Sequence, residues 1–466
     1  MIKSNLRKQM QNELNDKELF NQAKEYAFDY VDKSFERNVY PTEQAIEYLK
    51  VFEEQLPDKV GDPKMILEQL HKFGSPATVS QIGGRYFGLV NGGIIPTALA
   101  VKWLNDFWDQ NTPLFVTSPI SSKLETVVEN WLKQLFNLPE STVSGFVSGT
   151  SMAILCGLAA ARFRIYQRLN WDINSRGFMN APKVRIVAGQ HAHGTVLKAI
   201  ALLGFGKDNI EWVDVDSQGR MILDKIPELD ENTILVLQAG NVNSGSFDYF
   251  DEICDKAQKK NTWIHIDGAF GLWAAGSENL KYLTSGIEKA DSWSVDGHKT
   301  LNTPYDCGIV MCKDKEALAS ALQATGSYIV YGENRDGMLY TPEMSRRARA
   351  VELWATMKYL GKQGIDELVY GLHERAKQFA KELKENGFQI LNDVVFNQVL
   401  VACDNDLETE ATLRNIQDLR ECWCGGSVWF NRKVIRISVC SWATTEEDVT
   451  RSVLSFLKAR KQAVKK

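Results

Sequence analysis

Five short apolar runs decide the fold class of this 466-residue chain: VRIVAG (184–189), IEWVDV (210–215), TILVLQAG (233–240), TWIHIDGAF (262–270) and CGIVMC (307–312). Each is rich in branched apolar residues and bounded by polar residues or glycine, which is typical of a buried strand. Helical patterns occupy residues 151–168, 193–204, 248–260 and 276–289. This alternation predicts an α/β domain with a largely parallel sheet.

The segments on either side of this domain have different patterns. The first 75 residues predict a helical, amphipathic arm, with a helix start at Tyr40-Pro41-Thr42-Glu43. Such an arm cannot bury its apolar stripe alone, so it must pack on the body or on a partner subunit. Near the C-terminus, long helical patterns precede the strand-like runs FQILND, NQVLVAC and KVIRISVC and a closing helix. We therefore predict an arm at 1–75, a large α/β domain at 76–345 and a small α+β domain at 346–466.

Composition limits the class of protein. Hydrophobic residues make up 44% and charged residues 24%, which is ordinary for a globular protein, and the net charge of −5 gives no electrostatic reason to expect nucleic acid. No run approaches the about 18 apolar residues of a membrane helix, and the polar N-terminus lacks the apolar core of a secretory signal. The eight cysteines form no CxxC pair. We expect reduced thiols in a cytoplasmic protein, with metal binding or oxidation of the Cys422/Cys424 pair as the alternative.

A glycine-rich segment, Gly145-Phe-Val-Ser-Gly149-Thr150-Ser151, opens one of the predicted helices. Glycine lets backbone amides approach an anion closely, and a helix N-terminus presents free N–H groups and the positive end of the helix dipole. The hydroxyl groups of Thr150 and Ser151 add further donors. The segment therefore predicts a phosphate-binding site, although the same residues also suit an ordinary N-cap.

Two charged residues follow apolar runs at predicted strand ends. Asp267 ends the run TWIHID, and a buried acid is costly unless something pairs with it. It is either a structural cap or ion-pair partner, or a carboxylate that faces a cationic ring nitrogen. Lys299 follows the segment DSWSV (291–295) and stands beside His298, which makes it a candidate amine nucleophile rather than a surface charge.

Two histidines, His191 and His193, follow the run VRIVAG. An HxH pair can contribute to a metal site, but the remaining histidines have no ligand spacing, so we expect no metal. These remaining histidines are His71, His265, His298 and His373. An imidazole stacked on a flat ring fits the setting better.

The candidate groups follow one another along the chain as phosphate site, stacking histidine, acid and lysine. Pyridoxal 5′-phosphate requires this set: an anion site, a group on the ring face, a partner for the pyridinium nitrogen and an amine that forms an imine. Because the combination is more specific than any one group, the sequence predicts this cofactor.

The chain resembles the group II pyridoxal-phosphate-dependent amino-acid decarboxylases, the family of the aromatic-L-amino-acid, glutamate and histidine decarboxylases. The resemblance covers roughly residues 75–460 and is carried by ADSWSVDGHK (290–299), WIHIDGAFG (263–271), AHGTVLKA (192–199), RYFG (85–88) and SRR (345–347). The segments WDQN (108–111) and CWCGG (422–426) are similar to those of a bacterial subgroup. The resemblance implies fold type I, with a mostly parallel seven-stranded-type sheet, and an obligate homodimer whose active site lies at the subunit interface.

The resemblance also implies roles for single residues. Lys299 forms the Schiff base with the cofactor and later returns a proton, Asp267 keeps the ring nitrogen protonated, and His193 stacks on the ring near the substrate carboxylate. The other implied cofactor contacts are Gly149, Thr150, Ser151, Ala269, Asp296 and His298. Asp296 departs from the family, in which asparagine is frequent at this position, and an anion beside a phosphate is unfavourable.

A second departure concerns a tyrosine that characterised members carry on a mobile loop of the partner subunit. That tyrosine protonates the substrate carbon after carbon dioxide leaves. Counting back from Ser345-Arg346-Arg347, the comparable position falls near Arg335-Asp336-Gly337 and holds no tyrosine. Tyr328, Tyr331 and Tyr340 lie nearby, and we prefer Tyr340 as the catalytic residue, with simple packing beside Pro342 as the alternative.

Together these features predict a decarboxylase of L-amino acids that uses pyridoxal phosphate and binds neither nucleic acid nor membrane. Aromatic residues at 86, 87, 103, 107 and 108 either line an aromatic-substrate pocket or belong to the dimer interface. No arginine can be assigned to a side-chain carboxylate of the substrate, so glutamate is not favoured. The alternatives are an aldehyde synthase or aminotransferase on the same scaffold, and an inactive protein that only binds the cofactor.

Overall fold

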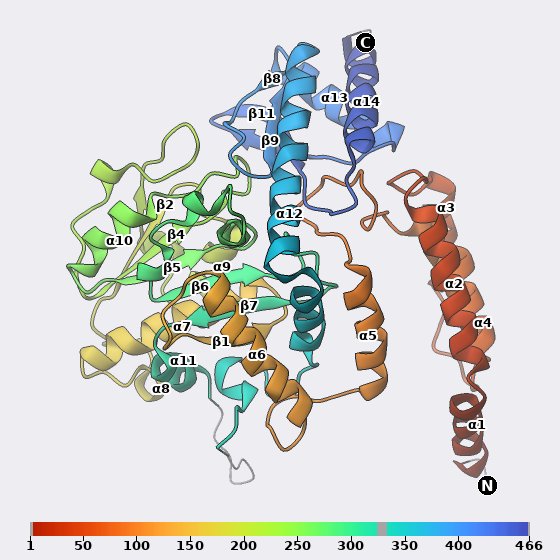
Figure 1. Ribbon diagram of the computed structural model, residues 1–466, viewed down its shortest axis with the longest axis horizontal. Helices are drawn as coiled ribbons and strands as arrows, with labels where there is room; N and C mark the ends of the chain where they lie inside the picture. The colour runs from red at the N-terminus through yellow and green to blue at the C-terminus, as the bar shows by residue number, and fades with distance from the viewer. Residues whose placement is uncertain (1–2, 324–332, 465–466) are drawn as a thin grey trace.

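A seven-stranded sheet forms the centre of the molecule (Figure 1). The computed structural model describes residues 3–323 and 333–464. The strand order is β1-β7-β6-β5-β4-β2-β3, and β7 is antiparallel to both neighbours whereas the other pairs are parallel. The strands are β1 (Val143–Val147), β2 (Arg185–Gly189), β3 (Ile210–Val213), β4 (Thr233–Gln238), β5 (Trp263–Asp267), β6 (Ser292–Asp296) and β7 (Gly308–Cys312). The predicted α/β class with a largely parallel sheet is confirmed.

Helices cover both faces of this sheet. Successive strand residues point to opposite faces, so Ile234 and Val236 of β4 pack in one core while Leu235 and Leu237 pack in the other. The first core includes α7 (Thr150–Arg168), α8 (Ile173–Arg176), α9 (Gly194–Leu202) and α11 (Lys315–Leu322). The second includes α6 (Pro119–Leu135) and α10 (Phe250–Gln258). Burial on both faces explains why the strands appear in the sequence as continuous apolar runs.

One predicted helix is wrong. Residues 276–289 form short 3-10 turns at Lys281–Thr284 and Ile287–Lys289 instead of a continuous helix. Between them Gly286 has a φ of +90°, and a Cβ there would lie 2.6 Å from the backbone nitrogen of Asp251. A left-handed glycine in close contact with another backbone breaks the helix.

The N-terminal arm consists of α1 (Lys3–Asp16), α2 (Glu18–Ser34), α3 (Glu43–Glu47) and α4 (Pro63–Gln69). The hydroxyl oxygen of Thr42 accepts a hydrogen bond from the Ala45 amide at 3.2 Å, so the predicted helix start is confirmed. Figure 1 shows the arm running beside α5 (Pro96–Trp108). Aromatic rings connect the two, with centroid distances of 5.1 Å for Phe20 and Phe107 and 5.9 Å for Phe28 and Trp103.

The C-terminal part contains a four-stranded sheet in the order β10-β11-β9-β8. Its strands are β8 (Gln389–Ile390), β9 (Gln398–Ala402), β10 (Gly425–Trp429) and β11 (Arg432–Ser438), and its helices are α13 (Asp406–Leu419) and α14 (Glu446–Val464). Helix α12 (Arg349–Glu385) bends at Gly361, where φ is +59°. Leu353, before the bend, packs in the core of the large sheet, whereas Phe379, after it, packs in the core of the small one. The helix therefore belongs to both parts, and the domain boundaries stay predictions.

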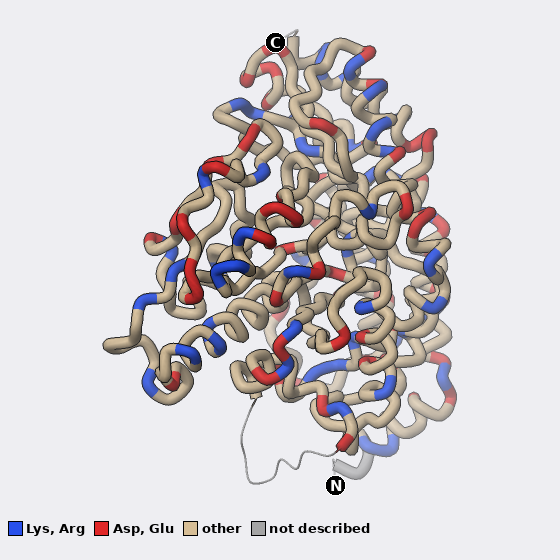
Figure 2. Tube along the Cα trace, turned by 60° about the vertical axis from the view of Figure 1, so that its left-hand side comes forward, with Lys and Arg blue, Asp and Glu red and all other residues tan. Residues whose placement is uncertain are grey.

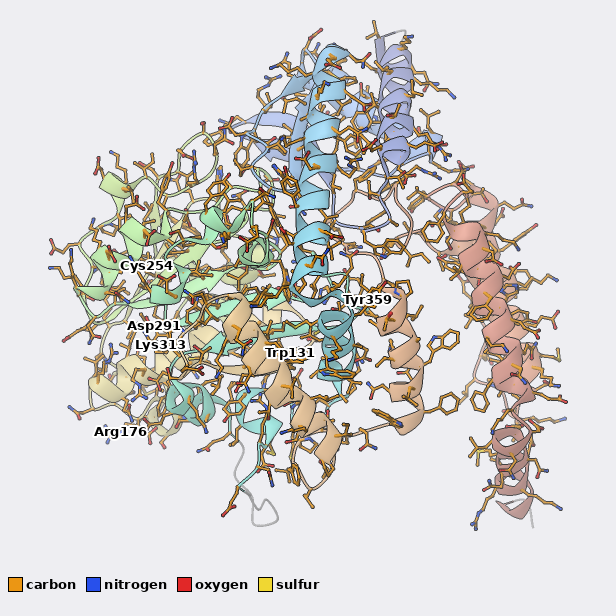
Figure 3. All side chains as sticks on the ribbon, in the orientation of Figure 1. Trp131, Arg176, Cys254, Asp291, Lys313 and Tyr359 are labelled. Atoms are coloured by element: carbon orange, nitrogen blue, oxygen red, sulfur yellow. The ribbon has the colours of Figure 1, made fainter. Side chains whose placement is uncertain are left out.

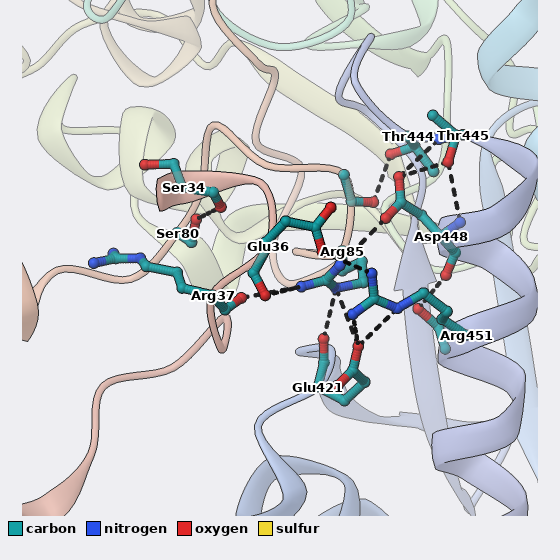
Figure 4. A network of polar contacts seen from close by, with 12 residues as sticks. Ser34, Glu36, Arg37, Ser80, Arg85, Glu421, Thr444, Thr445, Asp448 and Arg451 are labelled. Carbon is teal, nitrogen blue, oxygen red and sulfur yellow. Dashed lines mark hydrogen bonds and ion pairs between the residues drawn. The ribbon is translucent and has the colours of Figure 1, made fainter. Parts of the chain in front are cut away.

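A buried arginine joins the arm to the C-terminal part (Figure 4). The side chain of Arg85 is 3% exposed. Its Nε donates to the carbonyl oxygen of Glu421 at 3.0 Å and its Nη2 to that of Arg37 at 3.0 Å, while Nη1 lies 3.5 Å from the Asp448 carboxylate. This guanidinium therefore connects three distant segments of the chain.

Charged residues of both signs lie along the chain. Basic and acidic residues are both scattered over the described trace (Figure 2), and some form pairs such as Asp291 and Lys313 at 2.9 Å (Figure 3). Within residues 3–323 and 333–464, no helix is long and apolar enough to cross a membrane, and no group of His, Cys, Asp or Glu side chains could hold a metal ion. All eight cysteines are unpaired and buried.

A buried histidine in β5 gives the fold a testable pH dependence. His265 is fully buried, its Nδ1 lies 2.8 Å from the hydroxyl of Ser292, and burial lowers its pKa to about 3. Below pH 6.5 the unfolded chain gains a proton that the folded chain does not, so this residue makes the protein less stable as pH falls from 6.5 toward 3. Between pH 7.5 and 5.0, wild type should therefore lose about 2 kcal/mol more free energy of unfolding than His265→Leu, measured by urea unfolding. Equal losses in both proteins would contradict the assignment.

Candidate active site

A cavity of about 410 Å³ lies at the carboxyl ends of the central strands. In open α/β sheets ligands bind at this edge. The structure brings all the predicted cofactor contacts together around this cavity: Gly149, Thr150, Ser151, His193, Asp267, Ala269, Asp296, His298 and Lys299. The groups are up to 150 residues apart in the sequence and meet because each follows or ends a strand of the same sheet.

The glycine-rich turn after β1 contacts the end of β6. Since β7 runs antiparallel between them, β1 and β6 point in the same direction and end at the same edge. The amide of Thr150, the first residue of α7, donates to Oδ1 of Asp296 at 2.7 Å. Gly308 of β7 packs so closely that a Cβ there would lie 2.4 Å from the Cα of Gly149. Only glycine fits at this contact.

Lys299 lies on the short segment that follows β6. Its Nζ is 3.1 Å from Oδ2 of Asp296, and Nε2 of His298 is 3.6 Å from the same oxygen. The Cys307 amide donates to Nδ1 of His298 at 3.0 Å, so a neutral imidazole carries its proton on Nε2, toward Asp296. Burial lowers the pKa of His298, which favours this neutral form. The sequence analysis found a negative charge at Asp296 unfavourable beside a phosphate. In the structure the amine of Lys299 compensates this charge.

Asp267 ends β5 and is almost fully buried. Burial raises the pKa of its carboxyl group, whereas the nearby His193 and Lys299 oppose this shift. The amide of Ala269 donates to Oδ1 at 3.2 Å. A buried carboxylate with one backbone donor has room for a cationic partner, which would favour its charged form. This environment fits a protonated ring nitrogen.

His193 caps the N-terminus of α9 with its imidazole. Its Nδ1 accepts a hydrogen bond from the Thr195 amide at 3.3 Å and lies 2.7 Å from the Thr195 hydroxyl oxygen. Burial lowers the pKa of His193. The ring is therefore neutral with its proton on Nε2, which suits stacking on a flat ring. His191 instead lies against Trp429 and Phe430, with ring centroids 4.9 and 5.0 Å away.

The first turn of α7 fits a phosphate group. A helix N-terminus offers backbone N–H groups without intrahelical partners, and the dipole favours an anion there. The hydroxyl oxygen of Thr150 is buried and has no hydrogen-bond partner among the described residues. Such an orphaned donor is costly unless a ligand satisfies it. The cavity thus fits pyridoxal phosphate: Thr150 and Ser151 would hold its phosphate, His193 would lie beside its ring and Asp267 would face its ring nitrogen.

The structure does not bring Tyr340 to this cavity. Tyr340 is 4% exposed and lies in the core. The guanidinium carbon of Arg335 lies over its ring, 4.8 Å from the ring centroid. Within the single chain this corresponds to the packing alternative, and its catalytic role stays a prediction. Tyr328 and Tyr331 lie outside the described residues.

Most of the aromatic residues considered for a substrate pocket lie elsewhere. Phe87 is fully buried in the core of the C-terminal part, with its ring 4.8 Å from that of Phe379. Trp103 and Phe107 contact the arm. Burial raises the pKa of Tyr86 and the charge of Arg436 opposes this shift, so Tyr86 lies near Arg436.

Sequence reasoning missed two residues at the site, Arg436 and Tyr305. Arg436 comes from β11 of the small sheet, where its Nη1 donates to the carbonyl oxygen of Val242 at 3.3 Å and its Nε is buried without a hydrogen-bond partner among the described residues. Val242 lines the cavity, and the charge of Arg436 acts with burial to lower the pKa of His193, so Arg436 lies beside the cavity. The arginine inside the apolar run KVIRISVC was the available signal. Tyr305 lines the cavity directly, six residues after Lys299.

Comparisons with known proteins identify the family of the chain. Residues 46–402 match the family model described as the pyridoxal-dependent decarboxylase conserved domain. The chain is 27% identical over 349 residues to an aromatic-L-amino-acid decarboxylase of Bacillus atrophaeus, covering 71% of this chain and 70% of that protein. It is 25% identical over 330 residues to the acidic amino acid decarboxylase GADL1 of Mus musculus, covering 68% of this chain and 59% of that protein.

The fold is shared with solved structures. The crystal structure of Oryza sativa TDC with PLP and tryptamine superposes with a TM-score of 0.88 at 19% identity, covering 97% of this chain and 98% of that chain. This likeness establishes fold type I. With the family match over residues 46–402, it follows that the chain belongs to the pyridoxal-dependent decarboxylase family and is a carboxy-lyase that uses pyridoxal 5′-phosphate.

Proposed function

We propose that the protein converts an L-amino acid to its amine and carbon dioxide, with Lys299 holding the cofactor as a Schiff base. The observation that carries this proposal is the cavity in which Nζ of Lys299, the carboxylate of Asp267, the imidazole of His193 and the first turn of α7 meet. When bound, the cofactor accepts the electron pair that the departing carboxylate leaves on the α-carbon.

The chain's own residues divide the remaining tasks. Asp267 keeps a proton on the ring nitrogen, since its buried carboxylate is stabilised by a cation. Asp296 orients the amine of Lys299 from 3.1 Å away. The neutral His193, fixed by Thr195, covers one face of the ring and keeps water from it.

We further propose that Arg436 binds the α-carboxylate of the substrate. Its guanidinium is buried, burial lowers its pKa, and its Nε has no partner among the described residues, so a carboxylate satisfies both the charge and the donor. Arg436→Gln should lower kcat/KM about 100-fold, because a charge-assisted hydrogen bond to a buried group is lost. The matched control is Arg432→Gln on the same strand, whose guanidinium binds Gln389 and the carbonyl of Cys403 away from the cavity. Equal kinetics of the two variants would contradict the assignment.

The substrate class is tested with a panel of L-amino acids. One relative is named for aromatic and the other for acidic amino acids. We propose the aromatic class, since Tyr86 lies beside Arg436 and the described residues that line the cavity include no arginine for an acidic side chain. Purified protein with pyridoxal phosphate is given each amino acid while carbon dioxide, ammonia and peroxide are followed together. Carbon dioxide alone supports a simple decarboxylase, and all three products support the aldehyde synthase. Keto-acid release supports an aminotransferase, and cofactor binding without any product supports an inactive binding protein.

We also propose that the protein is a cytoplasmic homodimer. The arm and α5 expose large apolar side chains, among them Phe28, Met65, Leu104 and Phe107. Such a patch is unfavourable in water and fits a second copy of the chain. Light scattering that gives the mass of a single 52.6 kDa chain would contradict the dimer.

A further inference from the structure

A buried asparagine lies three residues after Lys299. Asn302 is 0% exposed, and its φ of +58° is a left-handed conformation that asparagine adopts more readily than most residues. Its backbone amide donates to the carbonyl oxygen of Lys299 at 2.9 Å. A polar side chain without solvent is costly unless its donors and acceptors find partners. The partners of this side chain therefore show which parts of the chain it holds together.

The nitrogen of the side chain binds two segments. Nδ2 of Asn302 donates to the carbonyl oxygens of Thr300 at 2.8 Å and Cys440 at 2.9 Å, and it also contacts the carbonyl oxygen of Lys299 at 3.3 Å. Thr300 follows Lys299 directly, and Cys440 lies just beyond the end of β11. This donor group thus joins the lysine segment to the small sheet.

The oxygen of the side chain binds two further backbone groups. Oδ1 of Asn302 accepts hydrogen bonds from the amides of Gly93 at 2.5 Å and Trp442 at 2.9 Å. The backbone carbonyl of Asn302 accepts from the Ile95 amide at 3.0 Å. A Cβ at Gly93 would lie 2.9 Å from Oδ1, so a larger residue there would push the segments apart. One asparagine therefore joins three distant segments of the chain, residues 93–95, 299–302 and 440–442.

The same segments support the arginine that is proposed to bind the substrate carboxylate. Arg436 lies on β11, just before residues 440–442. Its Nη2 donates to the carbonyl oxygen of Leu89 at 3.4 Å, in the segment that leads to residues 93–95. The separation of the Arg436 guanidinium from the Lys299 amine thus depends on how these two segments are held against residues 299–302. Asn302 binds both of them.

We propose that Asn302 is a positioning residue that sets the separation between the amine of Lys299 and the guanidinium of Arg436, an assignment that rests on the proposed function. Asn302 is not among the described residues that line the cavity, so it acts through these two groups. The cofactor is held at one end of this separation and the substrate carboxylate at the other. A displacement of about 1 Å between reacting groups can cost about 100-fold in rate.

The first test is a double-mutant cycle with Asn302→Gly and Arg436→Gln, in full-length protein loaded with pyridoxal phosphate. Glycine adopts the left-handed backbone without strain, so this variant removes the side chain alone. The probes are L-tryptophan, L-tyrosine, L-phenylalanine, L-glutamate and L-aspartate, and kinetics are measured with the one that wild type decarboxylates fastest. Asn302→Gly should lower kcat/KM about 30-fold.

The double variant separates positioning from a general structural effect. Because Asn302 acts through Arg436, the double variant should lose about as much kcat/KM as Arg436→Gln alone, about 100-fold. Independent effects of the two substitutions would multiply to about 3000-fold. That result would overturn the assignment.

The second test does not depend on turnover. Amide hydrogen exchange is followed by mass spectrometry in wild type and in Asn302→Gly. The amides of Gly93 and Trp442 lose their common acceptor in the variant, so the peptides that contain them should exchange at least about tenfold faster. Unchanged exchange in either peptide would show that Asn302 does not hold that segment, and the assignment would fail.

Thr303→Val is the matched control. Thr303 is the next residue, is also 0% exposed, and its hydroxyl oxygen lies 3.2 Å from that of Thr356 on α12. Valine has nearly the same shape but lacks this hydrogen bond. Stability should fall, while kcat/KM and the exchange at Gly93 and Trp442 should stay within about threefold of wild type. A loss of kcat/KM equal to that of Asn302→Gly would mean that any buried polar contact in this segment matters, against a specific role of Asn302.

Failure of the proposed function gives a different pattern. Wild type that releases no carbon dioxide from any probe overturns the proposed decarboxylation and the role of Asn302 in it, whereas the exchange experiment still shows whether Asn302 joins the three segments. Active wild type with multiplying losses or with unchanged exchange overturns the role of Asn302 and leaves the proposed function intact.

Discussion

Lys299→Ala is expected to reduce carbon dioxide release by about three to five orders of magnitude, because the reaction loses the amine that we propose holds the cofactor covalently. The visible absorbance near about 420 nm that a lysine Schiff base gives should be absent from the variant. Both readouts are taken on the same purified sample, with pyridoxal phosphate added in excess.

The matched control for this prediction is Lys299→Arg. Arginine keeps a cation beside Asp296, which Lys299 contacts at 3.1 Å, but its guanidinium stays protonated and cannot act as the nucleophile. If Lys299 is the nucleophile, both variants lose the absorbance and the activity. If its task were only to neutralise Asp296, the arginine variant would remain active, and the assignment would be wrong.

Asp267→Asn should lower kcat by about 100- to 1000-fold, equivalent to about 3–4 kcal/mol of transition-state stabilisation. The asparagine side chain has nearly the same shape and can still accept the hydrogen bond from the Ala269 amide, which is 3.2 Å long in the wild type. It provides no negative charge for the ring nitrogen. The electron pair on the α-carbon is then stabilised less. Attachment of the cofactor to Lys299 should survive, so single-turnover kinetics will show slow chemistry in a coloured enzyme.

Asp291→Asn is the control for this second prediction. Asp291 precedes β6, at the end of the sheet opposite the cavity, where it pairs with Lys313 at 2.9 Å and accepts from the Ile264 amide at 2.8 Å. Its replacement should affect stability and leave kcat unchanged. A loss of kcat as large as that of Asp267→Asn would show that any buried charge in this sheet matters, and would remove the specific role of Asp267.

The sequence predicted which residues gather at one cavity because these residues end or follow strands. Asp267 and Asp296 end their strands, and His193 and Gly149 come soon after theirs, so a correct strand pattern places them at one edge without knowledge of the tertiary structure. The family motifs added the order of the groups. Local pattern and global fold agree in this part of the chain.

Other parts of the site depend on contacts that no local pattern encodes. Arg436 reaches the cavity from a different sheet, 137 residues beyond Lys299, and only the packing of β11 against the loop at Val242 brings it there. Tyr305 was overlooked because an aromatic residue after a strand resembles core packing. The false helix at 276–289 has apolar periodicity, but the left-handed backbone of Gly286 is set by its contact with Asp251.

The junction at Arg85 makes the N-terminal arm inseparable from the active site. Arg85 donates to the carbonyl of Arg37 in the arm, and its neighbour Tyr86 lies beside Arg436 at the cavity. Loss of the arm would leave a guanidinium in the interior without the carbonyl acceptors of Glu36 and Arg37, one residue away from Tyr86. We therefore expect a chain shortened past Arg37 to be less stable at this junction. The segment after α2 and the RYFG segment (85–88) thus depend on each other for their hydrogen bonds.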